Sequence, residues 1–312
     1  MRAMVLCAGS GTRLRPLSEV WPKPACPVLN RALVAFNFAL LKGAGISEVA
    51  INTHHLADRM ARVAQVEASA LGMSLRLSHE ETLLGIGGGL KALEPYLRDG
   101  TFLLLNGDFI FDVDLKRAVE AHRSSGAAAT LIVQAPIEGY RSLHARADGR
   151  LACLPGELPA AGAAAWHFTG IHVLEPRIFA GLSARPSGIF ETGYRALLEV
   201  GADVQVHVDQ GTWRDVQTAE NYLATNLEAL DGRLPLGRFL RLGRLEAIAS
   251  GARVDGHVQE SVVGAGAVVP VGARVRRSVV LPGTTLGETE VLEDAIAAQS
   301  LRIKVGRDPS RT

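Results

Sequence analysis

The chain has 312 residues, of which 47% are hydrophobic and 21% charged, and its formal net charge is +1. This composition is typical of a globular protein with a substantial core, and the near-zero charge argues against a broad nucleic-acid surface. No run approaches the roughly 18 apolar residues of a membrane span. The N-terminus has no signal-peptide pattern and the three cysteines have no CxxC pair or metal-ligand spacing, so we expect a cytoplasmic protein that binds neither nucleic acid nor membrane.

Strand-like and helix-like segments alternate over the first 135 residues. The predicted strands are Arg2–Ala8, Glu48–Asn52, Leu75–Ser78, Phe102–Leu105 and Ala128–Val133, and the predicted helices lie near Leu33–Leu41, Leu56–Ala68 and Asp114–Arg123. Such alternation implies a parallel sheet with right-handed crossovers, whose ligands sit beyond the carboxyl ends of the strands. Gly9–Arg13 and Asp108 both fall at that edge, so the sequence predicts that they lie together.

The region from 136 to 232 has a more mixed pattern. A loop is expected over 155–165, strands at Trp166–Leu174 and Val204–Val208, and helices at Glu191–Val200 and Thr218–Leu230.

After Gly232, aliphatic residues recur every six positions at Val263, Val269, Val275 and Leu281. A period of six marks a β-helix in which each hexad is one short strand and a turn. The hexads from 252 to 287 predict about two coils, which should lean on the first domain or on another subunit. We therefore expect two domains, 1–232 and 233–312.

The strongest motif is the glycine-rich stretch that follows the first strand. It reads Leu-Cys-Ala-Gly-Ser-Gly-Thr-Arg-Leu-Arg-Pro-Leu over 6–17, and Pro-Lys-Pro follows at 22–24. Such a turn presents backbone N–H groups to phosphate oxygens, to which Arg13 adds a fork of donors and Lys23 a point charge. A dinucleotide fingerprint is disfavoured because Leu14 occupies its third glycine position, and a P-loop motif is absent.

This stretch resembles the signature of the sugar-phosphate nucleotidylyltransferases, G-x-G-[TS]-R-[LM]-x-P-L-[TS] followed by P-K-P, and the resemblance covers about residues 1–230. It implies an α/β fold with a Rossmann-like, mixed and mainly parallel sheet (the nucleotide-diphospho-sugar transferase fold), here with a short hexapeptide-repeat left-handed β-helix. It also implies a catalytic Arg13 that stabilises the departing pyrophosphate and a catalytic Lys23 that bridges the two phosphates. The implied nucleotide-binding residues of the loop are Ala8, Gly9, Ser10, Gly11 and Thr12.

Further family landmarks follow in order. Leu84–Gly89 resembles L-G-T-A-G-[GA], with Ile86 in place of the threonine, and implies that Gly87 and Gly88 bind the nucleotide together with Glu81. The alternative for this stretch is a glycine-rich entry to a helix with Glu81 in solvent. Asn106–Asp108 resembles [NG]-G-D and Trp213–Thr218 resembles W-x-D-V-G-T, with Gln217 in place of the glycine. The resemblance implies that Asp108 and Asp215 bind Mg²⁺, a hard ion that keeps few protein carboxylates and takes phosphate oxygens as other ligands.

The sugar side departs from the family more strongly. Trp166–Ile171 (WHFTGI) resembles the strand that walls the sugar pocket, and Thr169 and Gly170 are the implied sugar-phosphate-binding residues. Many members carry an E-K-P lysine in this region, whereas this chain has no lysine between Lys116 and Lys304. The candidate replacements are Arg141, Arg146 and Arg150. His54 and His55 are expected to be structural or pocket-lining.

The resemblance implies a Mg²⁺-dependent enzyme that transfers a nucleotidyl group from a nucleoside triphosphate to a sugar 1-phosphate. The sugar phosphate is already ionised near neutral pH, so positioning and charge neutralisation suffice without a general base. Such a domain followed by a short β-helix resembles the mannose-1-phosphate guanylyltransferase type, which implies guanylyl transfer to mannose 1-phosphate or to a related hexose or heptose. Uridylyl transfer to N-acetylmuramate 1-phosphate and a catalytically weak regulatory subunit that binds an NDP-sugar are the alternatives. A homo-oligomer is expected.

Overall fold

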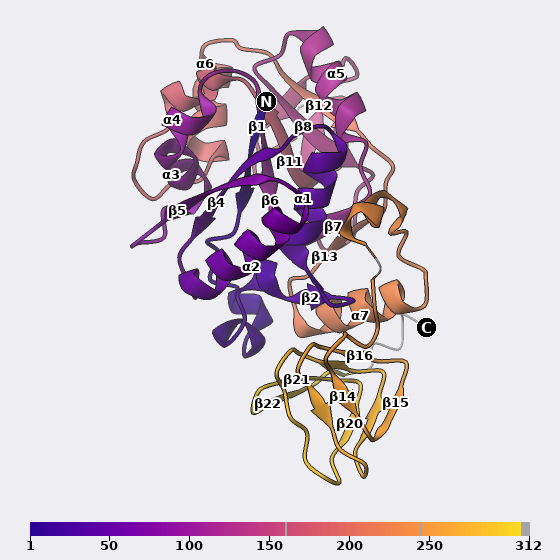
Figure 1. Cartoon of the computed structure of the whole chain (residues 1–312). Helices are drawn as coiled ribbons and strands as arrows, with labels where there is room; N and C mark the ends of the chain where they lie inside the picture. The colour runs from indigo at the N-terminus through magenta and orange to yellow at the C-terminus, as the bar shows by residue number, and fades with distance from the viewer. Residues whose placement is uncertain (160, 244, 307–312) are drawn as a thin grey trace.

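The computed structural model describes residues 1–159, 161–243 and 245–306. A nine-stranded sheet with helices on both faces forms the larger body, and a stack of short strands lies at one end of it (Figure 1). The strands of the large sheet are β1 (Arg2–Leu6), β4 (Glu48–Thr53), β5 (Ser74–His79), β6 (Phe102–Asn106), β8 (Ala129–Gln134), β9 (Ser142–Ala145), β10 (Leu151–Cys153), β11 (Ala164–Leu174) and β12 (Val204–Val208).

The sheet is mixed, and its parallel part positions the glycine-rich loop. The order is β10-β9-β11-β6-β1-β4-β5, with β8 pairing β11 and β12. Strands β6, β1, β4 and β5 are mutually parallel, whereas β11 runs antiparallel to β6, β8 and β9. Leu6 is paired with Asn106, so the carboxyl ends of β1 and β6 lie side by side. The predicted mixed, mainly parallel α/β sheet is confirmed.

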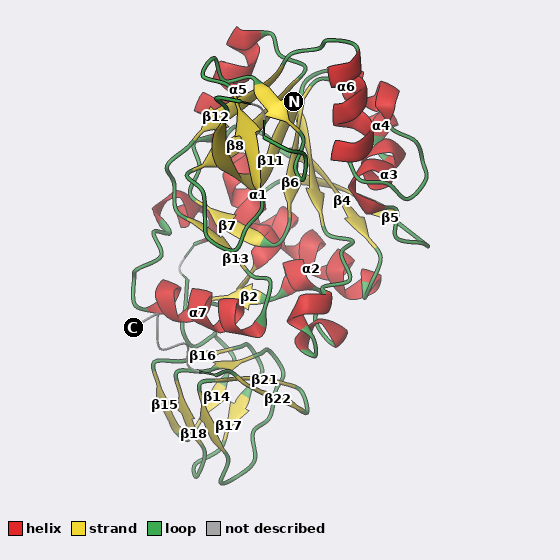
Figure 2. Ribbon diagram, turned by 180° about the vertical axis from the view of Figure 1, so that it is seen from behind, coloured by secondary structure: helices red, strands yellow, loops and turns green. Residues whose placement is uncertain are grey.

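Helices cover both faces of this sheet (Figure 2). Alternate residues of β1 face opposite ways: Ala3 and Val5 belong to one hydrophobic core and Met4 to the other. The first core includes residues of α1 (Leu33–Gly43), α2 (Ala57–Ala70), α5 (Leu115–Ser125) and α7 (Ala219–Leu230), and the second includes residues of α3 (Gly85–Ala92), α4 (Glu94–Leu97) and α6 (Arg195–Glu199).

The strands and helices predicted for 1–232 are present, with their ends shifted by a few residues. One difference is that the helix expected over Glu191–Val200 is a π-helical turn, η5 (Phe190–Tyr194), followed by α6. Short 3₁₀ turns complete the fold: η1 (Thr12–Leu14), η2 (Leu17–Glu19), η3 (Lys23–Ala25), η4 (Pro176–Gly181) and η6 (Gly237–Leu242). Among the described residues, no helix combines the length and apolarity that crossing a membrane requires.

Two small ribbons flank the large sheet. One is the hairpin of β2 (Pro27–Val28) and β3 (Arg31–Ala32), which directly follows η3. The other pairs β7 (Phe109–Phe111) with β13 (Trp213–Asp215) in antiparallel register. Because β7 begins directly after Asp108, this ribbon brings the Trp213–Thr218 motif next to the end of β6.

The C-terminal strands fit a β-helix. His257 pairs with Arg274 and Arg274 with Val291, a repeat of 17 residues, which is one residue short of three full hexads. The strands are β14 (Arg253–Val254), β15 (His257–Gln259), β16 (Val262–Val263), β17 (Val268–Val269), β18 (Arg274–Arg276), β19 (Val279–Val280), β20 (Val291–Glu293), β21 (Ala295–Ala298) and the antiparallel β22 (Leu301–Lys304). The sequence predicted about two coils. A third rung, β20 and β21, extends the stack because its strands continue past Gly287, where the glycine-marked hexads end.

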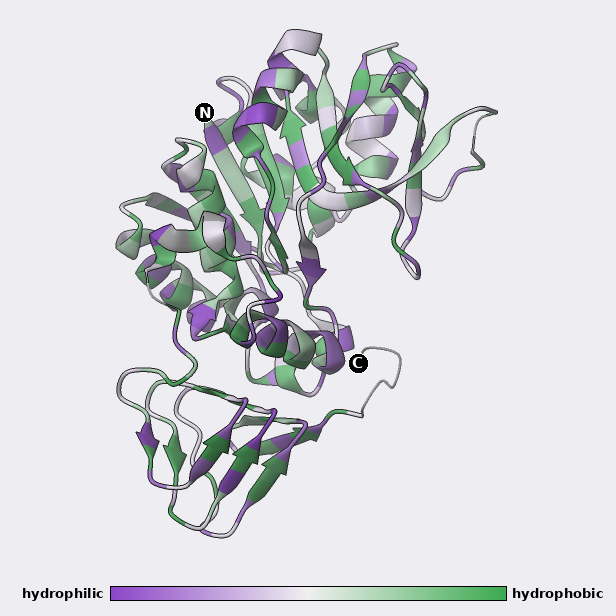
Figure 3. Cartoon of the chain, turned by 90° about the vertical axis from the view of Figure 1, so that its right-hand side faces the viewer, coloured by the Kyte–Doolittle hydropathy of each residue, from purple (hydrophilic) through white to green (hydrophobic). Residues whose placement is uncertain are grey.

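The stack packs directly on the larger body. Its strands alternate hydrophobic and hydrophilic residues (Figure 3). Val263, Val280 and Ala297 point into its own interior, whereas Val279 and Ile296 belong to the core that α1 and α7 share. The stack was expected to lean on the first domain or on another subunit, and the structure shows it on the first domain. The division into domains 1–232 and 233–312 stays a prediction.

Candidate functional site

The glycine-rich loop leaves β1 at the carboxyl edge of the sheet. Gly11 has a positive φ of 60°, and a Cβ there would lie 2.9 Å from the Ser18 Cβ, so the turn into η1 requires glycine. A Cβ on Gly9 would meet nothing within 4 Å, so packing does not require glycine there. Its bare backbone instead borders an open cleft, as expected of a loop that admits a phosphate group closely.

Lys23 and Asp108 form an ion pair at the same edge. The Lys23 Nζ donates to the Asp108 Oδ2 at 2.6 Å, and the two side chains are 10% and 29% exposed. Lys23 comes from η3 and Asp108 from the end of β6, 85 residues away in sequence. The pair places a cation and a carboxylate beside the glycine-rich loop.

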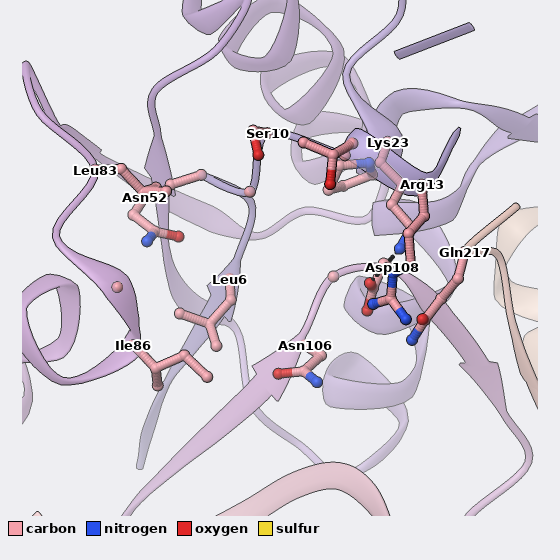
Figure 4. A pocket seen from close by; sticks show the side chains of 17 residues that line it. Leu6, Ser10, Arg13, Lys23, Asn52, Leu83, Ile86, Asn106, Asp108 and Gln217 are labelled. Atoms are coloured by element: carbon pink, nitrogen blue, oxygen red, sulfur yellow. Dashed lines mark hydrogen bonds and ion pairs between the residues drawn. The ribbon is translucent and has the colours of Figure 1, made fainter. Parts of the chain in front are cut away.

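These groups line one cleft of about 370 Å³. Figure 4 shows Arg13, Lys23, Asp108 and Gln217 on one side, and Leu6, Asn52, Leu83 and Ile86 on the other. The cleft therefore has a charged end and a more apolar end. Of the predicted site residues it brings together Ala8, Gly9, Ser10, Gly11, Thr12, Arg13, Lys23 and Asp108.

Asp215 opens into a neighbouring cavity rather than this cleft. That cavity has a volume of about 120 Å³ and is lined by Tyr140, Trp213 and Asn221 among others. The Asp215 carboxylate accepts hydrogen bonds from the Tyr140 hydroxyl at 2.5 Å and from the Asn221 Nδ2 at 2.9 Å. The backbones nevertheless touch, since the Val216 N–H donates to the Asp108 carbonyl at 3.1 Å. The two predicted metal ligands thus come from adjacent segments with side chains in adjacent cavities, and their metal-binding role stays a prediction.

An aromatic group borders Asp215. The rings of Tyr140, His167 and Trp213 pack edge to face, with His167 and Trp213 centroids 4.5 Å apart. His167 is buried, and neither of its ring nitrogens has a hydrogen-bond partner among the described residues. Burial lowers the pKa of His167, opposed in part by the nearby Asp215 carboxylate. The imidazole is therefore favoured in its neutral form.

The second glycine-rich segment forms the start of α3. A Cβ on Gly87 would lie 2.6 Å from the Ser187 Oγ, and one on Gly88 would lie 2.5 Å from the Arg185 carbonyl oxygen. These glycines therefore let the 185–188 segment pack against the helix, and they are not among the residues that line the cleft. Gly85 and Ile86 line it instead, and Glu81 is exposed. The assignment of Gly87, Gly88 and Glu81 to nucleotide binding stays a prediction.

A buried bridge that the sequence analysis did not single out joins the two glycine-rich segments. Glu80, only 2% exposed, accepts from the Asn52 Nδ2 at 2.8 Å and from the Leu84 N–H at 2.9 Å. The Asn52 Oδ1 in turn accepts from the Cys7 N–H at 2.8 Å. The one sequence signal for this bridge is that Glu80 comes two residues after the predicted strand Leu75–Ser78, but Glu81 comes only one residue later.

Thr169 and Gly170 lie on β11 beside the cleft. The Thr169 hydroxyl donates to the Ile132 carbonyl at 2.8 Å, and the Thr169 carbonyl accepts from the Trp213 Nε1 at 3.0 Å. Gly170 has a positive φ of 87°, and a Cβ there would lie 2.7 Å from the Asn106 Nδ2. Gly170 therefore lets β11 approach Asn106, which lines the cleft. The sugar-phosphate role of both residues stays a prediction.

The two histidines expected to be structural or pocket-lining bond to backbone carbonyls. His54 Nδ1 lies 2.9 Å from the Glu80 oxygen, and His55 Nε2 lies 2.9 Å from the Ser18 oxygen. Neither is among the residues that line the cleft. These contacts support the structural interpretation.

Comparison with known proteins gives relatives that are named as nucleotidyl transferases acting on sugar 1-phosphates. A UTP–glucose-1-phosphate uridylyltransferase of Synechocystis sp. is 31% identical over 194 residues, which are 57% of this chain and 50% of that protein. A mannose-1-phosphate guanylyltransferase of Mycobacterium tuberculosis is 28% identical over 317 residues, covering 97% of this chain and 81% of that protein. The chain thus spans about half the length of the first relative and most of the second.

A solved structure shares the fold. HddC from Yersinia pseudotuberculosis, crystallised with GMP-PN, superposes with a TM-score of 0.61 at 18% identity over 73% of this chain and 99% of that one. The family model described as nucleotidyl transferase matches residues 2–232, which include the glycine-rich loop, Lys23, Asp108 and Asp215. The match spans most of the chain, which therefore belongs to the nucleotidyl transferase family.

Proposed function

We propose that the protein transfers a nucleotidyl group from a nucleoside triphosphate to a sugar 1-phosphate, making an NDP-sugar and pyrophosphate. The observation that carries the proposal is the single cleft that contains the Gly9–Arg13 loop, Lys23 and Asp108. Backbone N–H groups and two cationic side chains suit a polyphosphate, and a carboxylate suits the cation that accompanies it. The functions for which the relatives are named support the same reaction.

The two ends of the cleft suggest how the nucleotide is oriented. The triphosphate would lie at the charged end, against Arg13 and Lys23, and the base at the end formed by Leu6, Leu83 and Ile86. Both functional groups of the Asn52 side chain are engaged, with Cys7 and Glu80. We therefore expect Asn52 to shape the base end rather than to read the base.

The donor set fits Mg²⁺. Asp108 supplies a partly exposed carboxylate in the cleft, and Asp215 supplies a second from the adjoining segment. A carboxylate offers about four lone-pair positions, so the hydrogen bonds from Tyr140 and Asn221 leave Asp215 able to bind a cation as well. Bound there, the ion would neutralise charge on the phosphates.

The reaction would be an in-line displacement at the α-phosphorus. An oxygen of the sugar phosphate forms the new O–P bond as the bond from the α-phosphorus to the bridging oxygen breaks, and that oxygen leaves with pyrophosphate. Arg13 would stabilise the charge on the leaving group. Lys23 would leave its ion pair with Asp108 and bind the phosphates instead. The residues thus supply position and charge and need not move a proton.

Guanylyl transfer to mannose 1-phosphate is our preferred assignment. The guanylyltransferase of M. tuberculosis is similar over 97% of the chain, which includes the stack. Uridylyl transfer is the alternative, supported by the Synechocystis relative and by the missing lysine on the sugar side. For the role of that lysine we favour Arg141, because it follows Tyr140 beside Asp215, whereas Arg150 pairs with Asp203 at 3.2 Å.

A substrate panel tests the function. Pyrophosphate release would be measured with GTP, UTP, dTTP, ATP and CTP against several sugar 1-phosphates, with Mg²⁺ and with EDTA. We expect turnover for at least one pair and none in EDTA. Binding of an NDP-sugar without turnover of any pair would favour the regulatory alternative. A homo-oligomer and a cytoplasmic location remain predictions from the sequence.

A further inference from the structure

The hairpin of β2 and β3 has a strained turn. Val28 pairs with Arg31, so the loop has two residues, Leu29 and Asn30, with φ of 43° and 64°. Positive φ at both positions defines the mirror-image turn that suits hairpins, and it favours glycine and asparagine. Leucine is unfavourable there, so the surrounding contacts must hold the turn in place.

Helix α7 holds this turn from one side. The Leu29 N–H donates to the Asn226 Oδ1 at 3.1 Å, and Leu29 is buried. The Tyr222 hydroxyl donates to the Pro27 carbonyl at 2.7 Å. On the other side Arg31 pairs with Glu67 of α2. The hairpin is thus fixed between two helices of the larger body.

Asn30 fixes it to the stack. The Asn30 Nδ2 lies 2.8 Å from the Glu246 carbonyl oxygen, 3.3 Å from that of Ala247 and 3.1 Å from that of Val263. Val263 belongs to β16, and its N–H donates to the Ala247 carbonyl at 2.7 Å. One side chain of the larger body therefore meets the first rung of the stack at three acceptors, and Figure 2 shows β2 beside α7, directly above β16.

The hairpin is continuous with the charged end of the cleft. The Cys26 N–H donates to the Lys23 carbonyl at 3.0 Å, and the Leu33 N–H donates to the Cys26 carbonyl at 3.1 Å. A rotation of the hairpin would therefore move η3 and with it the Lys23 ammonium. The same helix that holds Leu29 also holds Asp215, because Asn221 lies on α7.

We infer that Asn30 is a positioning residue through which the C-terminal stack fixes the hairpin and keeps Lys23 at its place opposite Asp108. The stack then acts on nucleotidyl transfer without contributing a group to the cleft. The kinetic part of this inference rests on the proposed function. Its structural part, the coupling of the stack to the Lys23 segment, does not.

Two substitutions of Asn30 test the inference. Asn30→Asp places a carboxylate against three carbonyl oxygens, and Asn30→Gly keeps a residue suited to φ of 64° while removing the donor. The matched control is Ser278→Ala, which removes hydrogen bonds to Arg276 and Ala295 inside the stack and leaves the Asn30 contact in place. Each full-length variant would be studied by hydrogen exchange of the 23–33 segment and by steady-state kinetics.

We expect Asn30→Asp to raise amide exchange over 23–33 and to lower kcat by about 10- to 100-fold, with a much smaller change in KM, as for a displaced catalytic group. Asn30→Gly should also raise amide exchange over 23–33 and lower kcat, but by less. If the aspartate variant does not fold, the glycine variant alone tests the inference. Unchanged exchange and kcat in Asn30→Gly, or an equal loss of kcat in Ser278→Ala, would overturn the inference. If the wild type turns over no substrate pair, the proposed function fails, while the exchange measurement still decides whether the stack holds the Lys23 segment.

Discussion

Glu80 offers a sharp test of how the two glycine-rich segments are held together. In Glu80→Gln the side chain keeps its size but has one acceptor oxygen where the structure uses two, for Asn52 and for Leu84. One of these buried donors must then face an NH₂ group. A hydrogen bond to a charged group contributes about 1.5–3 kcal/mol, so we expect the free energy of unfolding to fall by about 2 kcal/mol.

Loss of this bridge should also change nucleotide binding. Leu84, whose N–H bonds to Glu80, directly precedes Gly85 and Ile86, which line the cleft. We expect kcat/KM for the nucleotide to fall about tenfold, equivalent to about 1.4 kcal/mol. Urea unfolding and initial rates at varied triphosphate would measure the two effects. The control is Glu120→Gln, since Glu120 is an exposed glutamate of α5 that is not among the residues lining the cleft. If both variants behave alike, the bridge does not have the role described here.

Further predictions concern charge, substrate and pH. Asp108→Asn should abolish turnover and leave the circular dichroism spectrum unchanged; wild-type activity at saturating Mg²⁺ would refute the metal assignment. Arg13→Lys keeps the charge but loses the bidentate fork, so kcat should fall about 10²-fold, and an unchanged kcat would limit Arg13 to shaping the loop. The kcat/KM ratio should favour GTP over UTP by at least about tenfold, and a tenfold preference for UTP would reverse that assignment. Burial lowers the pKa of His172 to about 3. The unfolded chain then binds a proton below pH 6.5 that the folded chain does not, so stability present above pH 6.5 is lost as the pH falls towards 3. His172→Gln should remove about 2 kcal/mol of the loss in unfolding free energy between pH 7 and 5, and an unaltered pH dependence would contradict this.

The charged end of the cleft was predictable from the sequence because it depends on strand order alone. Gly9–Arg13 and Asp108 each follow a predicted strand, and parallel neighbours bring such strand ends together. Lys23 was located by its motif, and the structure pairs it with Asp108. Similarly, the six-residue period predicted the β-helix. Val263, Val269 and Val275 point into the interior of the stack, whereas Leu281 belongs to the core of the larger body and Val280 takes the inward position.

The remainder depends on contacts between distant segments. Gly87 and Gly88 are packed against 185–188, which no local pattern near residue 87 indicates. Asp215 is paired with Phe109, and its carboxylate meets Tyr140 and Asn221, which come from segments that no local pattern near residue 215 indicates. Glu80 and Glu81 differ by one position, and the choice between them is made by the Glu80 N–H, which continues the ladder to the Thr53 carbonyl at 2.8 Å. In each case the position of the side chain depends on a contact with a distant segment, which the local sequence does not specify.

The two cavities of the site are lined by different parts of the chain. Among the described residues, those that line the cleft fall between Leu6 and Asp108, with Gln217 as the exception, whereas the cavity at Asp215 draws on residues from Ile137 to Glu228. Substitutions accumulated in the later segment can therefore alter the surroundings of Asp215 while leaving the glycine-rich loop untouched. If the proposed function holds, exchanging 137–228 between relatives is a route to new acceptor sugars. Gln217 in the cleft, the contacts of 185–188 with Gly87 and Gly88, and the Asn226 bond to Leu29 would have to be matched across the junction.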